Sequence, residues 1–150
     1  MKIIAVYNIK GGVGKTATVV NLSYLAAKSG ANTLICDLDP QGSATYYFRI
    51  KPKFKKGRKG FIKGGKSIEQ NIKGTDYLNL DLLPADFSFR NLDLALDNVQ
   101  GSKRRLAKIF QSLKKEYDYI FIDCPPNITI VAENVFNAAD GILVPVIPTT

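Results

Sequence analysis

A glycine-rich stretch near the N-terminus, NIKGGVGKT at residues 8–16, could bind phosphate. Its last three residues match the end of the pattern G-x-x-x-x-G-K-[ST], although Ile9 occupies the place of the first glycine. In that pattern backbone N–H groups surround a polyphosphate, the lysine (Lys15) reaches its terminal oxygens and the hydroxyl (Thr16) binds Mg²⁺. A tight turn also needs glycine, but it needs neither lysine nor threonine. The stretch therefore predicts a nucleotide-phosphate loop, with a second lysine, Lys10, at its entrance.

Three acidic residues follow two apolar segments further along the chain. Asp37 and Asp39 belong to DLDPQG, and Asp123 is followed by Cys-Pro-Pro. Each has a simpler explanation, because Asp-Pro commonly opens a turn and a single Asp often caps a helix. In a parallel sheet, however, ligands bind at the carboxyl ends of the strands. The first two acids then suit a metal ligand and a water-orienting base, and Asp123 suits a partner of Mg²⁺.

Hydrophobic patterning predicts the elements that position these residues. The run at 3–7 indicates a buried strand, residues 14–29 a helix ended by Gly30, and TLICD at 33–37 a second strand. The remaining expectations are a helix at 67–72, a strand at 78–83, an amphipathic helix starting at Ser102 as N-cap, a strand at 117–123, a helix at 130–139 and a strand at 142–146. Alternating strands and helices predict an α/β fold, a parallel twisted sheet with helices on both faces.

The net charge of +8 comes from one segment. Residues 49–66 contain nine Lys or Arg and no acid, which leaves 12 positive and 13 negative residues elsewhere. Residues 40–66 lack periodicity, so they predict a loop or a loosely ordered hairpin. The basic loop 49–66 is either a solvated loop or a contact for DNA phosphates, with an acidic membrane surface a weaker third alternative. Phe54 and Phe61 either stack on bases or anchor the loop.

Other features exclude several classes of protein. The N-terminal apolar run is too short for a signal peptide, and no run reaches membrane-spanning length. Cys36 and Cys124 form no disulfide framework, so we expect two buried thiols at strand ends and a reducing cytosol. The sequence contains no helix-turn-helix or zinc motif, so we do not expect it to read DNA bases specifically.

The motifs KGGVGKT, DLDPQG and DCPP, in this order at strand ends, resemble the ParA-type partition ATPases. These are P-loop ATPases with a deviant Walker A motif, within the ParA/MinD superfamily. MinD-type relatives usually lack DPQG, and nitrogenase-reductase-like relatives need cluster cysteines that this chain does not supply. The resemblance implies one P-loop NTPase domain over residues 1–150. It also implies that the C-terminal part of the longer family fold is lacking.

The resemblance also implies a role for each motif residue. Lys10 would reach the nucleotide of a second subunit, Lys15 would be the ordinary phosphate lysine, and Asp39 would position the attacking water; these are the catalytic residues. Relatives usually have Thr or Ser at position 17, so Ala17 implies a weaker contact through its N–H. The residues implied to bind nucleotide are Lys10, Gly11, Gly12, Val13, Gly14, Lys15, Thr16 and Ala17. Those implied to hold the metal are Thr16, Asp37 and Asp123.

The function that the resemblance implies is ATP-dependent dimerisation with slow, Mg²⁺-dependent hydrolysis of ATP to ADP and phosphate, coupled to partition of plasmid or chromosomal DNA. The implied partners are a second copy of the chain, non-specific DNA and a ParB-like protein, with no membrane. The implied location is the cytoplasm, in association with the nucleoid. The alternative is a nucleotide-dependent binding switch or cargo-positioning module with little hydrolysis of its own.

Overall fold

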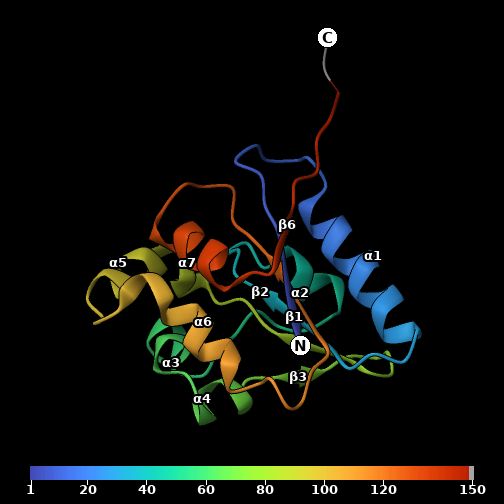
Figure 1. Cartoon of the computed structure of the whole chain (residues 1–150), viewed down its shortest axis with the longest axis horizontal. Coiled ribbons are helices and arrows are strands. Elements are labelled where there is room, and N and C mark those ends of the chain that lie inside the picture. The colour runs from blue at the N-terminus through green and yellow to red at the C-terminus, as the bar shows by residue number, and fades with distance from the viewer. Residues whose placement is uncertain (149–150) are drawn as a thin grey trace.

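A six-stranded sheet organises the computed structural model, which describes residues 1–148 (Figure 1). Its strand order is β3-β4-β2-β5-β1-β6. All neighbouring strands pair in parallel except β3 and β4, which pair antiparallel at one edge. The strands are β1 (Lys2–Val6), β2 (Thr33–Asp37), β3 (Lys73–Gly74), β4 (Leu80–Leu83), β5 (Tyr119–Asp123) and β6 (Gly141–Leu143). The predicted mostly parallel α/β sheet is confirmed.

Strand register brings the chemically active segments together. The β5 strand lies between β1 and β2, and Asp123 at its end is level with Val6 of β1 and Asp37 of β2. The glycine loop follows β1 directly, so its first residues leave the sheet beside the other two strand ends. The expectation that the three motifs lie together at the carboxyl ends of the strands is therefore confirmed.

Helices cover both faces of the sheet. On one face α1 (Lys15–Lys28) and α2 (Ser43–Tyr47) pack against the sheet, with Val19, Val20 and Phe48 in the shared core. The other face carries the larger core and the remaining helices, so α1 stands apart from them in Figure 1. These are α3 (Gly57–Lys63), α4 (Lys66–Glu69), η1 (Phe87–Asn91), α5 (Leu92–Asp97), η2 (Ser102–Arg104), α6 (Arg105–Gln111) and α7 (Ile130–Ala138).

The prediction of a loop over residues 40–66, including the basic loop 49–66, is wrong where the chain is helical, whereas residues 48–56 between α2 and α3 lie outside any helix or strand. The segment contains α2, α3 and the start of α4. The cause is tertiary packing: Phe54 and Phe61 are buried and form an aromatic cluster with Phe89 of η1, with ring centroids 5.2 to 5.8 Å apart. Neither ring is exposed for base stacking, so the alternative in which they anchor the segment holds.

Smaller differences concern where elements begin. Ser102 is not an N-cap: it is the first residue of η2, which Gly101 precedes with φ 73°, and α6 starts only at Arg105. The β4 strand begins at Leu80 rather than 78, after Asn79 with a φ of 61° breaks the extended backbone. Helices η1 and α5 lie where no element was predicted.

Two further observations bear on the excluded classes. Cys36 and Cys124 are free, buried thiols, as expected. Within residues 1–148, no helix is both long and apolar enough to cross a bilayer.

Candidate functional site

The glycine loop between β1 and α1 borders a hollow of about 420 Å³. Gly12 and Gly14 have φ angles of 72° and 91°, in the left-handed region that favours glycine, and Gly14 is the N-cap of α1. A Cβ built on either glycine would meet no atom within 4 Å, so the loop faces open space. The hollow is lined by Gly11, Gly12, Gly14, Lys15, Thr16, Ala17, Asp39, Ser43 and Pro126.

The two lysines of the loop differ in their surroundings. Lys15 is 8% exposed, and its ammonium donates a hydrogen bond to the carbonyl oxygen of Lys10 at 3.2 Å. The Lys10 side chain is exposed, and among residues 1–148 its ammonium has neither an ion-pair nor a hydrogen-bond partner. Lys15 is thus held inside the loop, whereas Lys10 is free to reach outward.

Asn8 fixes the start of the loop. Its side-chain oxygen accepts a hydrogen bond from the N–H of Lys10 at 2.8 Å, and its amide nitrogen donates to the carbonyl of Pro145 at 2.8 Å. Asn8 therefore ties the loop to the segment after β6. We did not predict this role from the sequence, in which the asparagine was only the residue that ends the apolar run.

The Thr16 hydroxyl donates a hydrogen bond of 2.7 Å to the carboxylate of Asp123, which is 1% exposed. Burial raises the pKa of Asp123 to about 6; the Thr16 bond opposes the rise, the nearby charge of Asp39 adds to it and that of Lys15 opposes it. A cation placed beside this carboxylate would favour its charged form. The pair predicted to hold Mg²⁺ is therefore in direct contact.

Asp37 lies deeper in the protein than the sequence suggested. It is fully buried, and it accepts hydrogen bonds from the N–H and the hydroxyl of Thr45, at 2.9 and 2.7 Å, and from the N–H of Asp39 at 3.1 Å. Burial raises its pKa to about 7, the Thr45 hydroxyl opposes the rise and the charge of Asp123 adds to it. Asp37 is close enough to interact with Asp123, but its oxygens already bind protein donors.

Thr45 was not predicted as a site residue. Its hydroxyl oxygen also accepts the N–H of Ala85 at 3.0 Å, so it joins α2 to the segment after β4. A signal existed in the sequence, since a Ser and a Thr follow DPQG at positions 43 and 45. Ser43 lines the hollow, as does Pro126 of the DCPP motif.

Asp39 lines the same hollow as the glycine loop. One of its carboxylate oxygens accepts the N–H of Gln41 at 2.9 Å, which orients the side chain. Ala17 also lines the hollow, but it lacks the hydroxyl that relatives usually have at this position. The neighbouring Thr18 hydroxyl does not replace it, because it donates a hydrogen bond to the carbonyl of Gly14 at 2.8 Å. The structure therefore brings most of the predicted nucleotide and catalytic residues to one hollow. Val13 is the first exception, because its side chain is buried, and Lys10 is the second, because its ammonium has no partner among residues 1–148.

The donor set fits a Mg²⁺ ion that arrives with phosphates. Within residues 1–148 no group of three or more His, Cys, Asp or Glu is placed to hold a metal. Mg²⁺ bound with nucleotides takes one or two protein ligands and completes its shell with water and phosphate oxygens. One hydroxyl, Thr16, beside one buried carboxylate, Asp123, meets that requirement.

Comparison with known proteins gives a consistent result. The family model described as "AAA domain" matches residues 1–150. The chain is 37% identical to the sporulation initiation inhibitor protein Soj of Bacillus subtilis, over 97% of this chain and 58% of Soj. It is 35% identical to the chromosome partitioning protein ParA of Myxococcus xanthus, over 96% of this chain and 51% of that protein. The chain thus spans little more than half the length of these relatives.

A solved structure of similar fold carries a nucleotide. Cobyrinic acid a,c-diamide synthase from Mycobacterium smegmatis, with bound ADP and magnesium, superposes with a TM-score of 0.90. The two sequences are 29% identical, over 97% of this chain and 60% of that one. The structural likeness therefore extends over nearly all of the present chain.

Proposed function

Because the chain belongs to the AAA-domain family, and within it to the ParA-type P-loop ATPases, we propose that it binds ATP with Mg²⁺ and hydrolyses it slowly in an ATP-dependent dimer. One observation carries the proposal: the glycine loop, Lys15, Thr16 and Asp39 line a single hollow, and the Thr16 hydroxyl donates a hydrogen bond to the buried Asp123. Nucleotide and magnesium in the M. smegmatis structure support the choice of ligands.

ATP binding uses the groups that the loop already presents. Gly11, Gly12 and Gly14 leave space for phosphate oxygens, and the N-terminus of α1 favours their negative charge. The ammonium of Lys15 would exchange the carbonyl of Lys10 for a phosphate oxygen, which is a stronger, charge-assisted partner. The N–H of Ala17 is the remaining donor toward the nucleotide.

Hydrolysis needs an oriented water and stabilised charge on the transferred phosphoryl group. Asp39 faces the hollow and is held by the N–H of Gln41, so its free oxygen can accept a proton of a water molecule. Thr16 and Asp123 would hold Mg²⁺, with Asp37 behind them as a further acid near the metal. Bound Mg²⁺ would neutralise charge on the phosphate oxygens.

Dimerisation supplies the remaining cation. The Lys10 side chain is exposed and without a partner among residues 1–148, while Lys15 already serves the loop of its own chain. In a dimer whose loops face each other, Lys10 would reach the phosphates of the second subunit. A cation provided in this way stabilises phosphoryl transfer only after dimerisation.

The cellular role proposed is partition of plasmid or chromosomal DNA, in the cytoplasm and in association with the nucleoid. It is supported by the names of the relatives Soj and ParA, and it includes non-specific DNA and a ParB-like protein as partners. Because the chain spans little more than half of these relatives, each part of this role is a proposal for the whole protein.

A phosphate-release assay tests the ATPase. The chain with ATP and Mg²⁺, with and without DNA, should release phosphate above background, and Asp39→Ala should reduce the rate to background while ATP still binds. Asp76→Ala, which removes an exposed carboxylate far from the hollow, is the matched control and should keep the rate. ATP binding without any phosphate release by the unmodified chain would instead support a nucleotide-dependent binding switch.

A further inference from the structure

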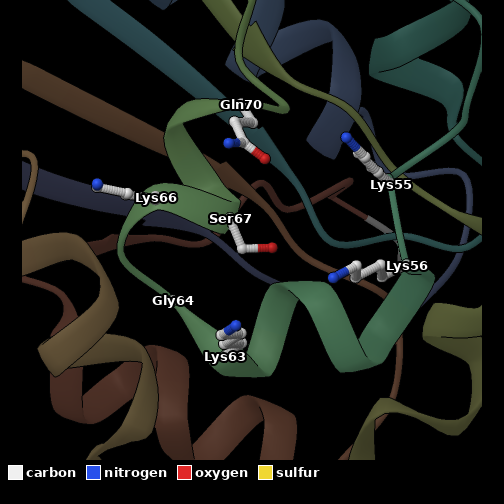
Figure 2. Close-up of a pocket in the computed structure, with 7 residues that line it drawn as sticks. All are labelled: Lys55, Lys56, Lys63, Gly64, Lys66, Ser67 and Gln70. Atoms are coloured by element: carbon white, nitrogen blue, oxygen red, sulfur yellow. The ribbon is translucent and has the colours of Figure 1, made fainter.

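A second hollow, of about 490 Å³, lies between α3 and α4, on the face of the sheet opposite α1 (Figure 2). Four of the residues that line it are lysines, and no acidic residue is among them. Its lining consists of Lys55, Lys56, Lys63, Gly64, Lys66, Ser67 and Gln70. The hollow contains none of the residues of the nucleotide loop.

The backbone that carries these lysines is fixed. Asn71 is 3% exposed, accepts the N–H of Lys55 at 2.5 Å and donates to the carbonyl of Ser67 at 2.6 Å, so it joins the two walls of the hollow. A Cβ on Gly60 would collide with the carbonyl oxygen of Lys55, which shows how closely α3 packs on the preceding segment. A solvated loop would need neither contact.

The amines themselves are not neutralised. Figure 2 shows the Lys56 ammonium and the Ser67 hydroxyl directed into the hollow, whereas the Lys66 side chain points outward. Among residues 1–148 the only ion pair joins Lys103 to Glu133, so none of the four lysines has a carboxylate partner there. The hollow therefore has a concentrated positive potential, which attracts polyanions.

The positive surface extends beyond this hollow. A further depression of about 500 Å³ lies on the other side of α3, and four of its nine lining residues are cations: Arg58, Lys59, Arg105 and Lys63, which borders both hollows. The other five are uncharged: Ile62, Leu94, Ala95, Asn98 and Val99. Cations on both sides of one helix match an extended polyanion better than a single phosphate group. The apolar residues of α3, Phe61 among them, face the core, so the helix presents no apolar face for insertion into a membrane.

We propose that this α3–α4 surface binds the phosphate backbone of duplex DNA, without reading its sequence, at a site separate from the nucleotide loop. The inference rests on the DNA partner of the proposed function and gives that partner a location. Lysines that contact phosphates release counterions, so binding should weaken steeply as salt is added. Sequence independence follows because contacts from ammonium groups to backbone phosphates carry no information about the bases.

The test compares two triple variants in binding to a fluorescent DNA duplex of arbitrary sequence, without nucleotide. Lys56→Gln/Lys63→Gln/Lys66→Gln removes three cations of the hollow, and Lys28→Gln/Lys114→Gln/Lys115→Gln removes three exposed cations elsewhere. The first variant should lose affinity on the order of 100-fold at about 0.1 M salt, and its log–log salt slope should become shallower by about 3. The second should lose far less, because none of its lysines lines the α3–α4 hollow.

Three results would overturn the inference. These are equal affinity of the two variants for DNA, absence of DNA binding by the unmodified chain, or lysine-dependent binding to phosphatidylserine vesicles without binding to DNA. ATP binding and phosphate release, measured on the same samples without DNA, separate this inference from the proposed function. DNA binding through these lysines in a chain that releases no phosphate would contradict the ATPase and leave the DNA surface supported.

Discussion

Two regions of the molecule concentrate charge in opposite ways. The first, the strand-end crevice, is the hollow beside the glycine loop together with the buried Asp37 and Asp123, and the second is the α3–α4 surface. In the crevice Asp37 and Asp123 are buried, and each carboxylate is held by hydrogen bonds from a threonine. On the α3–α4 surface the amines are exposed and unpaired within residues 1–148, while the segment is anchored by buried aromatic rings. The crevice depends on the exact positions of buried carboxylates, and burying them costs stability. The α3–α4 surface depends only on its positive potential, and exposed amines cost little stability.

The largest expected effect concerns the aromatic anchor of the α3–α4 surface. Phe61→Ala should destabilise the chain by about 3–5 kcal/mol, because a fully buried ring is lost from contact with Phe54 and Phe89. Urea unfolding measures the change. Phe87→Ala, at a ring 66% exposed, is the matched control and should cost about 1 kcal/mol or less. Equal losses in the two variants would mean that α3 is not anchored by its ring.

The next effect concerns the buried acids of the crevice. Burial raises the pKa of Asp37 to about 7 and that of Asp123 to about 6, so between about pH 4 and 7 the folded chain binds more protons than the unfolded one. Stability should therefore fall as pH rises through this range, by a few kcal/mol in total. Urea midpoints at pH 5 and pH 7.5 measure the fall.

Asp123→Asn provides the control for this pH dependence. An asparagine oxygen can still accept the Thr16 hydroxyl bond, but it does not titrate, so the fall between the two pH values should become smaller. Asp86 does not add to this fall. Its partial burial raises its pKa, but hydrogen bonds from Phe54 and Ser88 outweigh the burial and lower it, so the stability that Asp86 contributes is lost only at a pH below this range. Stability that rises from pH 5 to 7.5 in the unmodified chain would contradict the description of the crevice.

The smallest expected effect concerns the exposed lysines. Lys56→Gln/Lys63→Gln/Lys66→Gln should change the free energy of unfolding by less than about 1 kcal/mol, because the side chains are exposed and make no ion pair in residues 1–148. Urea unfolding of this variant beside the unmodified chain gives the value. A loss of several kcal/mol would show that these amines stabilise the fold, which would contradict the difference drawn between the two regions.

The same two regions differ in how far the sequence predicted them. The placement of the crevice residues was predicted nearly residue by residue, because a phosphate loop requires Gly14, Lys15 and Thr16 in fixed order and parallel strands bring their ends together. Their roles toward a nucleotide stay predictions. Asp37 shows the limit of that reasoning. Its position at a strand end was predicted, but the hydrogen bonds from Thr45 depend on how α2 folds back over it.

The helical α3 could not be predicted from local patterns. Its seven residues include Gly57 and Gly60, which disfavour a helix, and its inward-facing Phe61 and Ile62 are adjacent rather than spaced by three or four. The helix forms because partners distant in sequence, Phe89 above all, cover it. Charge without periodicity indicated a loop, and tertiary packing overrode that indication.

We propose that Lys15 serves the nucleotide of its own chain, whereas Lys10 serves the nucleotide of a partner subunit. The most direct test is Lys10→Ala, with ATP binding measured by titration and the ATP-dependent dimer by sedimentation on the same samples. We expect the monomer to bind ATP as before, whereas the dimer and its phosphate release should be lost. A Lys10→Ala chain that fails to bind ATP as a monomer would contradict this proposal.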